Sequence, residues 1–285
     1  MARGSRNRRR NRRRGRRRNH RRHQGHTPPP MLLAAPVVLL AILAAAMVWR
    51  PWDDGDHSPR LFIGVDRTGS YVRATGGNIE EDLGRVLGLC ATSSCYVAAD
   101  GLTGDTLGTS ALPVSTRLRV PRGNAGGDEN VNASLAGQIA DEWAGRIHDE
   151  LGFDRGATCS DVVSGFALAR EAMASFASDG LMAIVMMTDG YSNCPSWDVV
   201  TAAMVPGGID ALLARMQDAG AFPDLHGVTV RIVGGGRSAH QHAQLSTEIR
   251  SFWERYLQAA GATLPPDWWR TRFDATALTS AGVGR

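Results

Sequence analysis

The sequence contains no lysine, because all 32 of its basic residues are arginine. Without lysine the chain cannot carry a Walker A phosphate-binding loop, a Schiff-base lysine or a catalytic Ser/Lys pair. No CxxC pair occurs, which argues against a zinc site or a thiol redox motif. Full disorder is excluded as well, since 43% of the residues are hydrophobic, enough to bury a core.

Acidic residues are also missing from the N-terminal part, where none occurs before Asp53. Thirteen arginines lie before residue 23, whereas from Arg50 onward 19 arginines face 28 carboxylates, a net charge of −9. Residues 1–30 lack an apolar cluster and end in three prolines, so we expect a disordered tail. Its arginines could bind anionic lipid or nucleic acid, but the simpler interpretation is that they keep the tail in the cytoplasm beside an apolar segment.

That apolar segment is residues 31–49, which carry no charge. A helix of this length spans roughly 28 Å, close to the hydrocarbon thickness of a bilayer. We therefore expect an uncleaved transmembrane signal-anchor in the cell membrane, followed by a polar linker at 50–60 and a body outside the cytoplasm. The alternative is a cleaved signal peptide and a secreted protein, because small residues are available at 44–46.

Four cysteines follow in the body: Cys90, Cys95, Cys159 and Cys194. An even number of cysteines in an exported domain predicts disulfide bonds. Four cysteines allow three pairings, and the spacing alone does not choose among them.

Short apolar runs alternate with amphipathic segments along the body. Strands are expected at 61–65, 181–187 and 228–233, with weaker signals near 96–98 and 118–120. Helices are expected at 78–90, 131–151, from Asp161 onward, 209–217 and 241–260. This alternation predicts an α/β domain at 61–262, doubly wound and Rossmann-like, with a mostly parallel sheet covered by helices on both faces. A C-terminal tail is expected at 263–285, where Trp268 and Trp269 could cover a sheet edge or form part of a partner surface.

Oxygen-bearing side chains occur where predicted strands end and a predicted helix begins. Carboxyl ends of parallel strands meet at one edge of a sheet, so these side chains should converge there. Carboxylates and hydroxyls are the ligands that a hard divalent cation prefers. These side chains are Asp66, Thr68 and Ser70 after the first strand, those of the segment 158–161 at the start of a helix, and Asp189 after the strand at 181–187.

The pattern Asp-x-Thr-x-Ser at 66–70, a hydroxyl opening a helix at Ser160, and Thr-Asp-Gly at 188–190 resemble the metal-ion-dependent adhesion site of von Willebrand factor A domains. The resemblance covers about 61–262, and its end at 252–262 is similar to bacterial members. The resemblance implies that five residues are metal ligands for Mg²⁺ or Mn²⁺: Asp66, Thr68, Ser70, Ser160 and Asp189. It also implies that the bound cation holds a carboxylate of a partner protein. The family usually has serine where Thr68 stands and threonine where Ser160 stands. Asp161 and Thr158 stay alternatives to Ser160.

The resemblance also places Cys159 and Cys194 beside two neighbouring metal loops, which favours the pairs Cys159–Cys194 and Cys90–Cys95. The alternative joins Cys90 to Cys159. The expected function is a membrane-anchored adhesion or assembly module rather than an enzyme. Other hypotheses are a metal-assisted hydrolase using the same ligands, a metal-free scaffold in which the two aspartates only cap local structure, and a nucleic-acid role of the arginine-rich tail.

Overall fold

The computed structural model describes residues 56–69, 71–72, 79–91, 94–109, 112, 114–118, 129–152, 157–236 and 243–273. The expected basic tail, the expected membrane segment at 31–49 and the candidate ligand Ser70 lie outside these residues. None of the helices among the described residues has the length and apolar character needed to cross a membrane. The described residues all belong to one compact unit, Asp54–Arg285.

A six-stranded sheet with the strand order β3-β2-β1-β4-β5-β6 forms the centre of the fold. The antiparallel pairing of β2 with β3 is the exception, since the other neighbouring strands run parallel. The expected mixed α/β class with a mostly parallel sheet is therefore confirmed. The strands are β1 (Arg60–Asp66), β2 (Cys95–Leu102), β3 (Val114–Leu118), β4 (Met182–Met187), β5 (Val228–Val233) and β6 (Trp269–Arg270).

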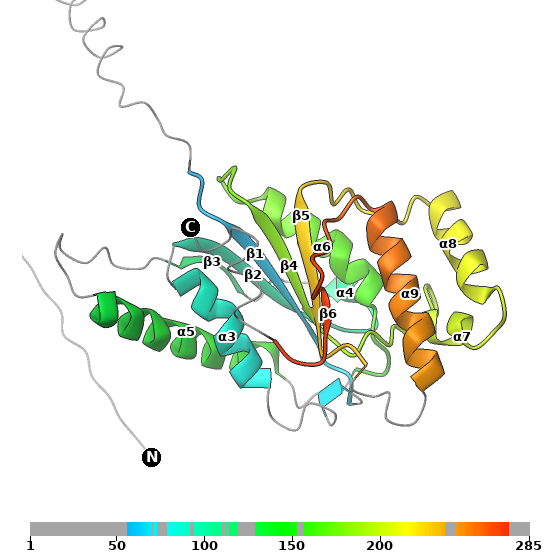
Figure 1. Ribbon diagram of the computed structural model, residues 1–285, viewed down its shortest axis with the longest axis horizontal. Helices are drawn as coiled ribbons and strands as arrows, with labels where there is room; N and C mark the ends of the chain where they lie inside the picture. The colour runs from blue at the N-terminus through cyan, green and yellow to red at the C-terminus, as the bar shows by residue number, and fades with distance from the viewer. Residues whose placement is uncertain are drawn as a thin grey trace, which may run out of the picture. The chain divides into compact units, whose positions relative to one another are not determined.

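Helices cover both faces of this sheet (Figure 1). Helices α3 and α5 pack on one face, against Ile63 and Val65 of β1, while α6 to α9 pack on the other, against Phe62. This two-sided burial explains why the central strands are continuous apolar runs without alternation. The described helices are α3 (Ile79–Ala91), α4 (Thr106–Thr109), α5 (Glu129–Leu151), α6 (Val162–Ala174), α7 (Val199–Ala203), α8 (Gly208–Asp218) and α9 (Ala243–Ala259).

The sheet continues beyond Ala262, where the sequence pattern suggested that the domain ends. Strand β6 pairs with β5, Trp268 is only 4% exposed, and Phe273 is buried in the core on the α3 side. Asp267 forms an ion pair with the buried Arg231 of β5. Residues 263–273 therefore belong to the domain rather than to a tail. A two-residue strand has no periodicity, so the sequence pattern could not indicate it.

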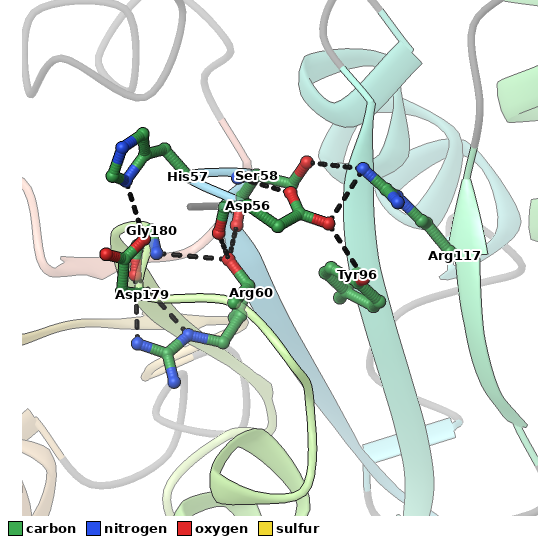
Figure 2. A network of polar contacts seen from close by, with 9 residues as sticks. Asp56, His57, Ser58, Arg60, Tyr96, Arg117, Asp179 and Gly180 are labelled. Carbon is green, nitrogen blue, oxygen red and sulfur yellow. Dashed lines mark hydrogen bonds and ion pairs between the residues drawn. The ribbon is translucent and has the colours of Figure 1, made fainter. Parts of the chain in front are cut away.

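The segment before β1 is fastened to the sheet instead of forming a free linker (Figure 2). Oδ2 of Asp56 accepts a 2.9 Å hydrogen bond from the Tyr96 hydroxyl and lies 2.9 Å from the Arg117 guanidinium. Arg117 also donates to the Ser58 hydroxyl at 3.0 Å. Hydrogen bonding from Ser58, followed by Tyr96 and the charge of Arg117, lowers the pKa of Asp56 to about 2.

The loop between α6 and β4 completes this fastening on the other side of the segment. His57 Nδ1 lies 2.6 Å from Asp179, and the Arg60 guanidinium donates to the carbonyl of Gly180 at 3.0 Å. A Cβ on Gly180 would lie 2.3 Å from the carbonyl oxygens of His57 and Ser58, so the two backbones can cross only at a glycine. We call residues 56–60, with Tyr96, Arg117 and 178–180, the entry clasp.

Both disulfides have the pairing that the resemblance favoured. Cys90–Cys95 joins the end of α3 to the start of β2. Cys159–Cys194 joins the segment before α6 to the loop after β4. Together they use all four cysteines.

Candidate metal site

Asp66 is the last residue of β1, which lies between β2 and β4 at the centre of the sheet. The order of strands reverses at this position, so the connections that leave β1 and β4 diverge toward opposite faces. A crevice at the carboxyl ends of the strands is the usual result and the usual place for a ligand. The Asp66 side chain is fully buried at this place, with 0% exposure.

Three hydroxyl groups from three different loops converge on the Asp66 carboxylate. Thr68 donates to Oδ1 from its hydroxyl at 2.7 Å and from its backbone N–H at 2.9 Å. Ser160 donates to Oδ2 at 3.0 Å, and Thr188 donates to the same oxygen at 2.8 Å. Thr68 follows β1, Ser160 precedes α6 and Thr188 follows β4, so the site joins segments up to 122 residues apart.

These four donors are neutral, so they satisfy the oxygens of Asp66 without balancing a negative charge. Burial raises the pKa of Asp66 above its usual range and outweighs the lowering effect of the hydrogen bonds from Thr68, Thr188 and Ser160. A second carboxylate, that of Asp189, is 1% exposed and accepts the backbone N–H of Tyr191 at 3.0 Å. Two buried carboxylates at one sheet edge are costly unless a positive charge joins them.

The segment 158–161 contains three candidate ligands, and the structure separates their positions. Thr158 is exposed to solvent. Asp161 caps the N-terminus of α6, where its side chain accepts the backbone N–H of Ser164 at 3.1 Å. Ser160 is fully buried, and its hydroxyl reaches Asp66. Of these three residues, Ser160 is the one that the fold brings to the predicted site.

Ser192 and Asn193 hold Ser160 in place, and sequence analysis did not single them out. The Ser160 N–H donates to Asn193 Oδ1 at 2.9 Å, while its carbonyl accepts the Ser192 hydroxyl at 3.0 Å and the Asn193 N–H at 3.2 Å. Cys159, which precedes Ser160, forms a disulfide with Cys194, which follows Asn193. The sequence signal that could have identified Ser192 and Asn193 is their position between Thr-Asp-Gly at 188–190 and Cys194.

Thr188 is a further site residue that the sequence pattern did not identify as a contact of Asp66. Besides donating to Asp66, its hydroxyl accepts the N–H of Gly190 at 3.0 Å and so shapes the turn that carries Asp189. Register explains the contact, because Val65 and Met187 are paired across β1 and β4, which places Asp66 beside Thr188. Threonine at this position therefore links the two carboxylate loops.

The donor atoms fit a hard divalent cation, since carboxylate and hydroxyl oxygens come together without nitrogen or sulfur ligands. Asp66, Thr68, Ser160 and Asp189 could supply these oxygens, while Ser70 lies outside the described residues. Among the described residues no group of three or more His, Cys, Asp or Glu side chains is placed to hold a metal. A cation beside Asp66 would thus depend on hydroxyl and water oxygens in addition to two carboxylates.

Neither protein-family models nor curated proteins show a match to this chain. Among solved structures, the chain is similar to the pilus adhesin SpaC of Lactobacillus rhamnosus GG in its open conformation, with a TM-score of 0.38 and 13% sequence identity. The similarity covers 79% of this chain and 29% of the adhesin chain. At this TM-score the likeness carries no inference about function, which has to come from the geometry of the site.

Proposed function

We propose that the body of this protein is a von Willebrand factor A-like module, doubly wound around its sheet, that binds a partner protein through a divalent cation. Its metal ligands would be Asp66, Thr68, Ser70, Ser160 and Asp189, and the cation would be Mg²⁺ or Mn²⁺. The convergence of three loop hydroxyls on a buried carboxylate is the observation that carries this proposal.

Each residue of the site has a distinct part in this function. Asp66 supplies a buried negative charge that favours cation entry, and Thr68 and Ser160 supply neutral oxygens. Because few carboxylates would contact a bound cation directly, part of its positive charge would stay unneutralised. That charge would attract a carboxylate of the partner. Ser192 and Asn193 keep Ser160 in its orientation, as outer contacts of metal ligands commonly do.

The module would act outside the cytoplasm, attached to the cell membrane by residues 31–49. Two disulfides suit an oxidising compartment and support this placement. In this arrangement the arginine-rich tail stays cytoplasmic, where it could also contact anionic lipid or nucleic acid. Adding protease to intact cells should digest the body and spare residues 1–30, whereas the reverse pattern would contradict this topology.

The metal proposal can be tested on the purified full chain with Mn²⁺, which is paramagnetic and can replace Mg²⁺ at an oxygen site. Calorimetry measures binding of Mn²⁺ alone. Nuclear magnetic resonance then follows the side-chain protons of N-acetyl-glutamate amide, with N-acetyl-glutamine amide as the uncharged control. We expect Mn²⁺-dependent broadening of the glutamate probe well above that of the glutamine probe.

Asp66→Ala and Asp218→Ala form a matched pair for this experiment. Both remove one carboxylate, but Asp218 is exposed at the end of α8. The proposed site requires that Mn²⁺ binding and probe broadening vanish in Asp66→Ala and persist in Asp218→Ala. A parent chain that binds no cation, or an Asp66→Ala variant that binds it unchanged, would refute the metal mechanism.

A further inference from the structure

The loop that carries Asp189 is gripped by two tryptophans from outside the ligand motif. We infer that Trp253 of α9, with Trp269 of β6 packed against the same turn, is a positioning residue that sets the place of Asp189 in the cation site. This inference rests on the proposed function, because it assigns residues that tune the same site. Neither tryptophan belongs to the ligand pattern.

Trp253 acts through a hydrogen bond to the residue after Asp189. Its indole N–H donates to the carbonyl oxygen of Gly190 at 2.8 Å, across 63 residues of sequence. Gly190 has a φ of 85°, a conformation that side chains other than glycine rarely adopt. The Trp253 indole therefore fixes the carbonyl group of Gly190, and the hydroxyl of Thr188 fixes the N–H of the same residue. Both groups lie in one tight turn.

Trp269 closes the same turn by direct packing. A Cβ on Gly190 would lie 2.6 Å from Cη2 of Trp269 and 3.2 Å from Nε1 of Trp253. A Cβ on Gly235, in the loop after β5, would lie 2.6 Å from Cε2 of Trp269. One ring therefore covers two neighbouring loops at the carboxyl edge of the sheet, and the turn has no room to move toward it.

The indole of Trp253 is itself immobilised by the core. It is fully buried and packs against Phe252, Phe166 and Tyr256, with ring centroids 5.0, 5.7 and 5.6 Å away. The hydrogen bond consequently ties the Asp189 turn to the body of α9. Because the indole N–H is held firmly, the position of α9 determines the position of the turn. A mobile surface side chain would not have this effect.

The test compares two substitutions on the same helix, each of which removes one hydrogen-bond donor. Trp253→Phe removes the N–H and keeps an aromatic ring. Tyr256→Phe is the control, because it removes a hydroxyl that donates to Ala221 at 3.3 Å in the loop before β5, at the opposite edge of the sheet. Both changes are made in the full chain, and thermal unfolding in EDTA confirms that each variant is folded.

Two measurements distinguish positioning from general stability. We expect Mn²⁺ affinity to fall about tenfold in Trp253→Phe, as is usual when an outer contact of a metal ligand is lost, and to stay within about twofold in Tyr256→Phe. In EDTA, amide hydrogen exchange of residues 188–193 should accelerate in Trp253→Phe alone, while β4 stays protected.

The outcomes separate this inference from the proposed function. Unchanged affinity and exchange in Trp253→Phe, or equal losses in both variants, would overturn the positioning role. If the parent chain binds no Mn²⁺, the proposed function fails and the exchange measurement alone decides the role of Trp253. Faster exchange of residues 188–193 in Trp253→Phe alone would support the inference that Trp253 holds the turn. Unchanged exchange would refute it.

Discussion

The hydroxyl of Ser160 donates a 3.0 Å hydrogen bond to the carboxylate of Asp66, although 94 residues separate them. Both side chains are fully buried. Ser160 is held in turn by Asn193, at 2.9 Å, and by the adjacent disulfide. The site is therefore built into the fold by contacts among loops, and its response to substitution can be predicted from them.

Removing the charge of Asp66 should raise the stability of the folded protein and abolish its metal binding. In Asp66→Asn the remaining oxygen can still accept the N–H of Thr68, while the hydroxyls of Ser160 and Thr188 can turn to accept from the new amide. Because a buried charge is lost, we expect the free energy of unfolding in EDTA to rise by about 1 kcal/mol. Mn²⁺ binding should disappear. Denaturant titration and calorimetry measure the two effects, and a fall in stability without loss of Mn²⁺ binding would contradict this account.

Replacing Thr188 should weaken the link between the two carboxylate loops. Thr188→Val has nearly the same shape, but it leaves the Gly190 N–H without its partner and removes one of the two hydroxyl donors to Oδ2 of Asp66. We expect the free energy of unfolding to fall by about 2 kcal/mol. Thr188→Ser keeps the hydroxyl and serves as the control, with a smaller loss. A loss confined to Thr188→Ser, with Thr188→Val as stable as the parent chain, would assign the effect to the methyl group rather than to the hydrogen bonds.

The two disulfides should differ in what they contribute. Cys159–Cys194 encloses a longer loop, with a sequence separation of 35 against 5 for Cys90–Cys95. Loop entropy predicts a loss of about 4 kcal/mol when the first pair is changed to serine and about 2 kcal/mol for the second. Because only the first pair borders Ser160, only its removal should also weaken Mn²⁺ binding. Chemical denaturation and calorimetry on the two double variants test both statements, and an equal effect on binding would refute the second.

The entry clasp should make stability depend on pH in the acidic range. The pKa of Asp56 is lowered to about 2 in the folded protein, below its value of about 3.8 in an unfolded chain. The unfolded chain therefore binds a proton first, so the stabilisation is complete above about pH 4 and is lost as pH falls toward 2. Asp56→Asn should flatten this part of the profile of melting temperature against pH, and Asp218→Asn should not. Identical profiles for the parent chain and Asp56→Asn would contradict the assignment.

Much of the fold could be predicted from the sequence because burial on both faces of a sheet leaves a local pattern. The strand at 228–233 was predicted with its observed bounds, and the helix beginning after Asp161 was predicted from its capping residue. The fold class followed from the alternation of such segments. Elements that are short or lie at an edge, such as α7 and β6, leave no periodic pattern, and they were missed for that reason.

The sequence by itself determined which residues stand at strand ends, and with them the carboxylates Asp66 and Asp189 and the hydroxyls of Thr68 and Ser160. Only the tertiary structure decided that Ser160, rather than Thr158 or Asp161, reaches Asp66, that Thr188 joins it, and that Trp253 holds the turn after Asp189. These contacts span 63 to 122 residues. They depend on strand register and on the packing of helices from separate parts of the chain, which leave no signal in the spacing of neighbouring residues.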